Sequence, residues 1–566
     1  MNSLIPPEQR LPEYHDRPVL NFIIHCIWYP ASPLIFLLLL IFFTSAPKQP
    51  HLIEPDFSPA ILFGVIKFFF FAWFVFALVR CLATHRPDFF YRLMQLLRTL
   101  VTPLDNLFSG EDPLQDIWLG FGSDGAPVTL TPRAAHQHTL IIGSTQTGKS
   151  TLARIWAVQR NDTSLMVIDP HASLVEHLLA DDVLNNFPHH AVFPLISGMD
   201  FVPGLNILQP LPGEAAVDCA RRLVDVSSDI FFRGDVTAAS RFRDVLFHTA
   251  WALSATGWTL AEVNTFLQSA AFRAHITRRV THLPTLHRWL TDAAEMTPTR
   301  WRERTESTAN RFRAFETGEP ALIFGQRKST LDLHAFLQAP RALWLAPLTV
   351  DALGQDGAFL VAGLLLSITD TILSRRHKGG ADNPNFLLLA DEFQRYPTVA
   401  LERLLAERRG YGAAVMLISQ GIGQLPAWLR TVIMNNVYNI AAFRLAPEGA
   451  DLLAPRLFHI SPLMVRRRRY DSTVELYNYA DALPQYREKL QELGNRVFFL
   501  RHGLAPARLV HAPEIHLPDG FPAQTLEKIL KHRGRPRALV AAELNQRHRR
   551  LATGNFSPTE AGDDWH

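Results

Sequence analysis

The chain has 566 residues, with 56 lysines and arginines against 53 aspartates and glutamates, and a formal net charge of +3. This length exceeds what one hydrophobic core supports and predicts two to four domains. The near balance of charge excludes nucleic-acid binding through bulk charge, and the three scattered cysteines exclude a disulfide framework or a cysteine-rich metal site.

Two long apolar runs near the N-terminus predict a membrane anchor over residues 20–83. The runs cover about 20–43 and 60–79, and each has the roughly 20 residues needed to cross a hydrocarbon core. Two buried helices of a soluble protein are the alternative, but runs this apolar leave no polar face for water. Arginines flank the pair on its outer sides. The positive-inside rule therefore places residues 1–19 and the whole body in the cytoplasm, with a short loop at 44–59 on the periplasmic side.

Residues 143–150 match G-x-x-x-x-G-K-[ST], the pattern of a phosphate-binding P-loop, between a predicted strand and a predicted helix. Glycines at both ends let the main chain wrap a phosphate with its N–H groups pointing inward. Lys149 supplies a charge for the β- and γ-phosphates of ATP, and the Ser150 hydroxyl is placed to ligate Mg²⁺. The residues expected to bind nucleotide are Gly143, Ser144, Thr145, Gln146, Thr147, Gly148, Lys149, Ser150 and Thr151.

This motif lies in residues 84–209, which we interpret as the first part of an α/β nucleotide-binding domain. A second buried strand over 164–168 ends at Asp169-Pro170-His171. Strand ends of this kind are where open α/β sheets bind ligands. Asp169 or His171 can contact nucleotide or cap the helix that begins near Leu174, and we favour the capping role.

Residues 210–324 show helical spacing with few strand signals, which predicts an all-α domain inserted into the nucleotide-binding domain. The region is rich in arginine. Most of these side chains are expected on solvated helix faces, and a minority are expected to contact DNA phosphates without regard to sequence.

Residues 325–515 return to an α/β pattern and predict the second part of the nucleotide-binding domain. Four apolar residues after Phe386 lead into Asp391 and Glu392. Asp391 is expected to hold Mg²⁺, and Glu392 to deprotonate the water that attacks the γ-phosphate. The next predicted strand ends at Gln420, whose amide is placed to sense the γ-phosphate.

Arginines near this strand are candidates for a residue that acts on a neighbouring subunit's nucleotide. Arg409 is the first candidate, followed by Arg408 and Arg444. A structural salt bridge is the alternative role for each of them.

The C-terminal part is basic. Four consecutive arginines at 466–469 favour either a phosphate-backbone contact or a solvated loop. Residues 516–566 predict a helix followed by a partly disordered basic tail. Within that tail, Arg533-Gly534-Arg535-Pro536 resembles a minor-groove hook.

The order of these motifs resembles the type IV secretion coupling proteins of bacterial conjugation, in the FtsK–HerA superfamily of P-loop ATPases. The similarity is carried by the two-span anchor, GSTQTGKST, the all-α insertion, LLLADEFQRYP, the run ending in LISQGIGQL, and NNVYNIAAFRL. It implies a RecA-like α/β core and an ATP- and Mg²⁺-dependent motor on the bacterial inner membrane. By position, Lys149, Ser150, Asp391, Glu392, Gln420 and Arg409 match the family's nucleotide residues.

The resemblance also implies partners. They are DNA bound without sequence preference, a relaxase or relaxosome, the components of a secretion channel, and further copies of the chain in a homo-hexamer. Residues 169–173 depart from a motif that many members carry, which makes a catalytic role for that stretch doubtful. Two alternatives stay open: an FtsK- or HerA-like translocase in chromosome or plasmid processing, and a membrane recruitment platform that hydrolyses ATP poorly.

Overall fold

The computed structural model describes residues 116–554 except 161–162, 181–183, 185–186, 194–197, 233–235, 381–382, 424, 459–464, 468–473, 477–478 and 516–522. Both predicted membrane spans, the loop between them and residues 1–19 lie outside the described residues. Within the described part, one helix, α16 (Val350–Ser374), is long and apolar enough to cross a membrane. Its apolar window is 89% buried inside the protein, as expected of a core helix.

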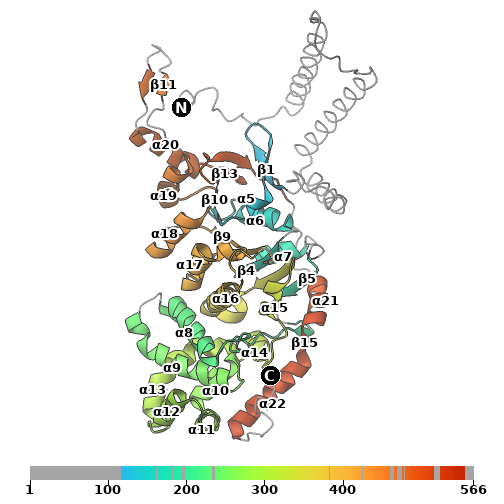
Figure 1. The fold of residues 1–566 in the computed structure, drawn as a ribbon, viewed down its shortest axis with the longest axis vertical. Helices are drawn as coiled ribbons and strands as arrows, with labels where there is room; N and C mark the ends of the chain where they lie inside the picture. The colour runs from blue at the N-terminus through green and yellow to red at the C-terminus, as the bar shows by residue number, and fades with distance from the viewer. Residues whose placement is uncertain are drawn as a thin grey trace, which may run out of the picture. The chain divides into compact units, whose positions relative to one another are not determined.

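An eleven-stranded sheet forms the centre of the described chain, in the order β2-β1-β14-β13-β10-β3-β9-β8-β4-β7-β5 (Figure 1). The seven strands from β10 to β5 are parallel, and the other four pair antiparallel. The strands are β1 (Ile117–Gly122), β2 (Pro127–Leu130), β3 (Thr139–Ile142), β4 (Ser164–Asp169), β5 (His189–Val192), β7 (Ala342–Pro347), β8 (Phe386–Asp391), β9 (Ala413–Ser419), β10 (Asn439–Ala442), β13 (Val497–His502) and β14 (Arg508–His511).

Helices cover both faces of the parallel part, which is why its strands are continuous apolar runs. Successive residues alternate between two hydrophobic clusters: Leu140 and Ile142 belong to one, and Ile141 belongs to the other. Residues of α6 and α7 lie in the cluster of Ile141, and those of α16 to α19 lie in the other. These and the neighbouring helices are α5 (Pro132–Ala135), α6 (Lys149–Val158), α7 (Ser173–Ala180), α15 (Leu333–Gln338), α17 (Val399–Ala406), α18 (Ala427–Asn436), α19 (Pro447–Leu457) and α20 (Tyr479–Gln491).

A helical region separates the short strand β6 (Phe201–Val202) from β7, within the range where an all-α domain was predicted. Its first helix packs against its second and against α16 of the core. The α-helices are α8 (Ala216–Phe232), α9 (Val236–Ala255), α10 (Val263–Gln268), α11 (Ala270–Arg279), α12 (Pro284–Ala294), α13 (Pro298–Phe312) and α14 (Gly318–Phe324). The boundaries between the predicted domains stay predictions.

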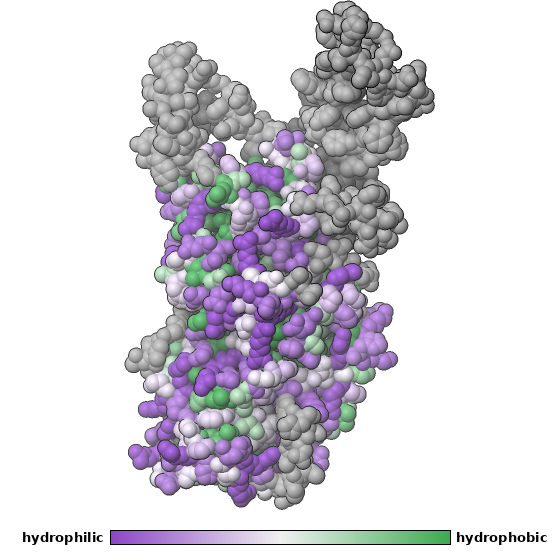
Figure 2. Space-filling view, viewed as in Figure 1, coloured by the Kyte–Doolittle hydropathy of each residue, from purple (hydrophilic) through white to green (hydrophobic). Residues whose placement is uncertain are grey.

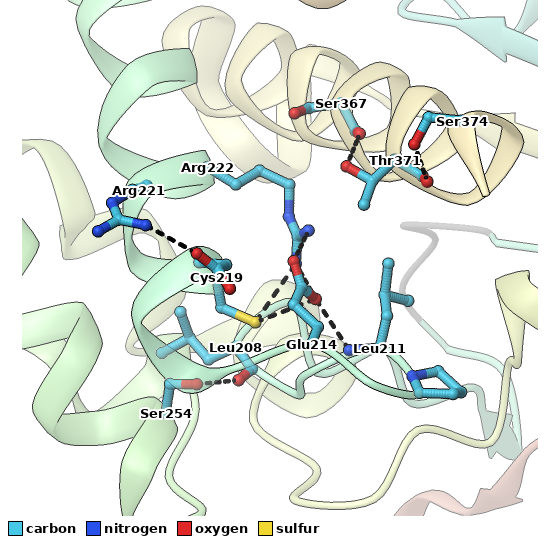
Figure 3. A network of polar contacts seen from close by, with 12 residues as sticks. Leu208, Leu211, Glu214, Cys219, Arg221, Arg222, Ser254, Ser367, Thr371 and Ser374 are labelled. Atoms are coloured by element: carbon cyan, nitrogen blue, oxygen red, sulfur yellow. Dashed lines mark hydrogen bonds and ion pairs between the residues drawn. The ribbon is translucent and has the colours of Figure 1, made fainter.

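A buried ion pair fixes the entry to this region (Figure 3). Arg222 Nη1 lies 2.5 Å from Glu214 Oε1, and both side chains are almost fully buried. Glu214 also accepts hydrogen bonds from the Leu211 N–H at 2.9 Å and from the Cys219 thiol at 3.4 Å. Burial raises the pKa of that thiol to about 12. Because each charge has a partner, the network is structural.

The described part of the C-terminal segment, residues 523–554, forms α21 (Ala523–Arg533), β15 (Arg535–Pro536) and α22 (Arg537–Thr553), where the sequence predicted one helix followed by a partly disordered tail. β15 pairs antiparallel with β6, and the Arg535 guanidinium is bound to Glu543 at 2.5 Å. Arg535 thus belongs to a strand and an ion pair, and a DNA contact by residues 533–536 stays a prediction.

Ion pairs hold α22 against the all-α region, alongside which it runs in Figure 1. Arg537 Nη2 lies 2.6 Å from Glu319 Oε1, and Arg547 Nη2 lies 2.8 Å from Glu262 Oε1. Hydrophilic residues predominate on the described part of the face in Figure 2, and hydrophobic ones occur there in small groups. The remaining strands, β11 (Val465–Arg467) and β12 (Val474–Leu476), pair antiparallel, and β11 contains the first two arginines of the basic run at 466–469.

Candidate nucleotide-binding and catalytic site

The P-loop lies between the end of β3 and the start of α6, as the sequence predicted. Gly148 has a φ of +109° and Gln146 a φ of +60°, so the loop turns back on itself before the helix begins. A Cβ on Gly143 would lie 2.5 Å from the Phe443 Cβ, which leaves room only for glycine at that position. Phe443 packs against Phe498 with ring centroids 4.9 Å apart, and this pair forms the floor of the loop.

Lys149 and Thr147 tie the loop to itself. The Lys149 Nζ donates to the Ser144 carbonyl at 2.7 Å, and the Thr147 hydroxyl donates to the same oxygen at 2.8 Å. Burial lowers the pKa of Lys149, while Asp391 and Glu392 act in the opposite direction. The ammonium group therefore lies in the field of both carboxylates, at the edge of the sheet where β8 ends.

Ser150 and Thr151 occupy the first turn of α6, beside Lys149. The first amides of a helix have no intrahelical acceptor and point toward an anion placed at its N-terminus. Thr145 and Gln146 are exposed on the loop, while Lys149, Ser150 and Thr151 are half-buried. The loop thus places main-chain donors, a hydroxyl and an ammonium group around a single space.

Asp391 ends the buried strand β8 and Glu392 follows it directly, and each side chain is only 8% exposed. Glu392 has a φ of +50°, a conformation that costs free energy for a residue with a side chain and is often found at functional sites. Its amide donates to Asp391 Oδ1 at 2.9 Å, and the Tyr396 hydroxyl donates to the Asp391 carbonyl at 2.6 Å. Burial, then the nearby Asp169, raises the pKa of Asp391 to about 7.

Gln420 contacts Glu392 directly. The strand β9 lies between β3 and β8, so the prediction that Gln420 follows the strand next to the Asp-Glu strand is confirmed. Its amide Nε2 donates to Glu392 Oε1. On the other carboxylate oxygen, Gln394 Nε2 lies at 3.5 Å, His171 Nε2 at 3.7 Å and Arg395 Nε at 3.8 Å. Glu392 is thereby held between two glutamine amides.

Asp169 caps α7, as the sequence led us to favour. One carboxylate oxygen accepts from the His171 N–H at 2.9 Å, and the other accepts from the N–H groups of Leu174 and Val175 at 2.8 and 3.1 Å. Burial raises the pKa of Asp169, and these hydrogen bonds oppose the effect. Both oxygens of this carboxylate are therefore engaged by the main chain at the start of α7.

The candidate arginines occupy different edges of the sheet. Arg409 is exposed on a short 3₁₀ helix before β9, at the edge of the sheet opposite Lys149. Arg408 is buried and pairs with Asp370 at 2.6 Å. Arg444 follows β10, and its carbonyl accepts from the Ser144 N–H at 2.8 Å.

The sequence analysis missed two residues beside the site. Gln394 follows Glu392 by two positions in a 3₁₀ turn, and its polarity after an apolar strand was the only signal. Arg496 has a φ of +63° and donates its N–H to the Thr147 carbonyl at 2.8 Å. No motif marks Arg496, because it lies directly before β13, which is distant from the P-loop in sequence.

The donor set fits Mg²⁺ and a nucleoside triphosphate. Mg²⁺ takes hard oxygen ligands, usually one or two from protein with the rest from phosphate and water. The Ser150 hydroxyl and the Asp391 carboxylate supply such oxygens, while Lys149 and the start of α6 supply positive charge. The described residues hold no group of three or more histidine, cysteine or acidic side chains placed to bind a metal without the nucleotide.

The fold of this chain is similar to that of solved structures of other proteins. No protein-family model matches the chain, and no curated protein is similar to it in sequence. The plasmid coupling protein TrwB in complex with the GTP analogue GDPNP is 14% identical, with a TM-score of 0.51 over 70% of this chain and 90% of that one. Unbound TrwBdeltaN70, a bacterial conjugative coupling protein, is 15% identical, with a TM-score of 0.50 over 72% and 91%.

A third solved structure, TrwB in complex with ADP and Mg²⁺, is 13% identical, with a TM-score of 0.50 over 70% of this chain and 89% of that one. At such identities a likeness concerns the fold. The described part of this chain has the RecA-like α/β fold of the bacterial conjugative coupling protein TrwB.

Proposed function

We propose that the chain is an ATPase whose active site is the carboxyl edge of the sheet. The observation that carries this proposal is the convergence of Lys149, Asp391, Glu392 and Gln420, which come from three adjacent strands. Lys149 and the P-loop amides bind the phosphates, and Ser150 and Asp391 hold Mg²⁺. The bound ion stabilises negative charge on the transferring phosphoryl group.

Glu392 then orients and deprotonates the attacking water. The Gln420 amide contacts Glu392 and so lies beside the place of the γ-phosphate. The end of β9 can therefore respond when the γ-phosphate leaves. Arg409 contributes from a neighbouring copy, where it stabilises the transition-state charge. This assignment requires an assembly, because Arg409 lies at the edge opposite the P-loop of its own chain.

We further propose that ATP hydrolysis moves DNA, and that the protein is a coupling protein of a type IV secretion or conjugation system. The fold of TrwB over most of its length supports this proposal, together with the helical region between β6 and β7. The two apolar N-terminal runs support a location on the bacterial inner membrane. The partners implied are DNA without sequence preference, a relaxase, channel components and five further copies of the chain.

The experiment measures phosphate release by the full-length protein in detergent or lipid, with Mg·ATP, with and without single- or double-stranded DNA. Stimulation by either DNA supports the motor function. Hydrolysis that no DNA changes would contradict DNA as the cargo while leaving the ATPase assignment intact. Failure to bind a fluorescent ATP analogue would contradict both the ATPase assignment and the motor function.

A further inference from the structure

His171 lies between the candidate general base and solvent. Its Nε2 is 3.7 Å from Glu392 Oε2, and the imidazole side chain is 57% exposed, whereas the Glu392 side chain is 10% exposed. The separation is longer than a hydrogen bond, but contacts of a catalytic group are often long before substrate binds, and one water can bridge them. The imidazole thus connects an almost buried carboxylate to bulk water.

Glu392 has to lose a proton after each hydrolysis step. As proposed above, its carboxylate takes a proton from the attacking water, and it must be ionised again before it can activate the next one. Gln420 donates to Oε1, and Gln394 Nε2 lies 3.5 Å from Oε2. A side-chain amide is not basic, so neither glutamine can take the proton away.

Two further side chains of the described residues lie near Oε2, and of these only the imidazole can take the proton. Arg395 Nε is 3.8 Å from that oxygen, but a guanidinium has no site that accepts a proton and stays charged. Lys149 carries an ammonium group that donates to the Ser144 carbonyl, and it has no such site either. A histidine ring exchanges protons near neutral pH, and its second nitrogen can release a proton after the first has received one.

The loop that carries His171 is held in place by the main chain. Both Asp169 oxygens accept N–H groups, one of them that of His171 itself, and the Asp169 carbonyl accepts from the Leu348 N–H at 2.9 Å. Ala172 has a φ of +63°, which is unfavourable for a residue with a Cβ and is a kind of strain that gathers at functional sites. The imidazole therefore extends from a fixed main chain toward one carboxylate.

Three charged groups of the described residues lie around the imidazole. They are the Glu392 carboxylate, the Asp169 carboxylate at the start of the same loop, and the Arg395 guanidinium on the turn after β8. The two carboxylates favour the imidazolium that forms when a proton arrives, and the guanidinium opposes it. Neither form of the ring is therefore stabilised by all of its neighbours, which suits a group that receives and releases a proton in each cycle.

We propose that His171 carries the proton from Glu392 to solvent. In the hydrolysis step, the oxygen of the attacking water forms a bond to the γ-phosphorus, the bond from that phosphorus to the bridging oxygen of ADP breaks, and the water proton moves to Glu392. The proton then passes from Oε2 to Nε2 of the neutral His171 ring. The imidazolium releases a proton to bulk water, which leaves His171 neutral and Glu392 ionised again.

This inference rests on the ATPase function proposed above and adds a residue that acts through Glu392. The sequence made a catalytic role for residues 169–173 doubtful, because the stretch departs from the motif that many coupling proteins carry. His171 has a role in proton transfer here, while Asp169 caps α7.

The test measures kcat and KM for phosphate release by the full-length protein in detergent with Mg·ATP. His171→Ala is expected to lower kcat about tenfold with KM unchanged, because the ring is lost beside the base. Added imidazole should restore kcat to within about threefold of wild type, whereas pyrazole, a ring of the same shape that is a much weaker base, should not. His189→Ala, which removes an exposed histidine on β5, is the control and should leave kcat unchanged.

His171→Asn separates proton transfer from hydrogen bonding. An asparagine amide can still donate to Glu392 but cannot carry a proton, so kcat should stay about tenfold below that of wild type. In a Glu392→Gln background, His171→Ala should cause no further loss, because the two residues act in series.

Two outcomes would overturn the relay and leave the ATPase function intact. One is a His171→Ala or His171→Asn variant that hydrolyses ATP at the wild-type rate, and the other is equal rescue of His171→Ala by pyrazole and imidazole. Wild-type protein that binds ATP but releases no phosphate would instead reject the ATPase function, and the relay with it.

Discussion

The two edges of the parallel sheet carry buried charge in different ways. At the carboxyl edge, Asp391 and Glu392 lie beside Asp169, and burial together with that neighbour raises the pKa of Asp391 to about 7. At the amino edge, Asp370 is equally buried, but Arg408 and Arg403 lie 2.6 and 3.1 Å from its oxygens. One edge holds carboxylates in excess over cations, and the other holds a closed ion-pair network.

This difference teaches that burial of charge does not by itself mark a functional site. The amino edge uses its charges to join α16 to α17 and to the turn before β9. The carboxyl edge leaves its charges incompletely neutralised, and the Mg²⁺ of the proposed ATPase is a group that would neutralise them. Changes at the amino edge should therefore affect stability, and changes at the carboxyl edge should affect chemistry.

The largest effect is expected from Lys149→Ala. Loss of the ammonium group removes charge stabilisation of the transferring phosphate and should lower ATP hydrolysis by about a thousandfold or more. Phosphate release by the full-length protein measures this. Lys528→Ala, an exposed change on α21, is the control and should hydrolyse ATP at the wild-type rate. Hydrolysis unchanged in Lys149→Ala would remove the P-loop from the active site.

Glu392→Gln should lower kcat by about a hundredfold or more while ATP still binds, because an amide cannot accept the proton of the attacking water. Single-turnover hydrolysis and equilibrium binding of a fluorescent ATP analogue separate the two effects. Glu295→Gln, an exposed substitution on the all-α region, provides the matched change of charge. If the Glu392→Gln variant hydrolyses ATP at the wild-type rate, another group is the general base.

The sequence predicted the parts of this site that follow from a local pattern of residues or from the order of the parallel strands. Gly143 and Gly148 are required by the packing of the loop on Phe443, and β8 ends at Asp391 because its apolar run ends there. Gln420 was placed correctly because β9 is the strand next to β8. In each case a local pattern and the order of parallel strands suffice.

The sequence could not predict side chains whose roles are set by distant partners. Arg408 and Arg409 are adjacent, and only Asp370 on α16 decides which of them turns inward. The C-terminal arginines were interpreted as a tail because the segment is basic. Arg547 instead pairs with Glu262, a fully buried carboxylate that is remote in sequence.

The two arginines before β9 give a direct test of the difference between the edges. Arg408→Ala leaves Asp370 buried with one cation fewer, and should lower the free energy of unfolding by about 3 kcal/mol. Arg409→Ala should leave that free energy unchanged within about 0.5 kcal/mol and reduce hydrolysis only where the protein is assembled. Thermal unfolding and concentration-dependent phosphate release measure the two effects. Equal losses of stability in both variants would contradict the assignment.

The smallest expected effect concerns pH. The pKa of Asp391 is about 7 in the folded chain and about 3.8 when unfolded. Between these values the folded chain keeps a proton that the unfolded chain has lost, so stability falls as the pH rises through this window.

Asp391→Asn removes this penalty and should stabilise the nucleotide-free protein at pH 8 by on the order of 2 kcal/mol, with almost no effect at pH 4. Thermal unfolding at the two pH values measures the difference, and Asp292→Asn, which changes an exposed carboxylate on α12, provides the control. A gain of the same size at both pH values would show that Asp391 is ionised throughout. Mg·ATP should reverse the ranking at pH 8, because the wild-type carboxylate then has a cation to ligate and the amide holds that ion more weakly.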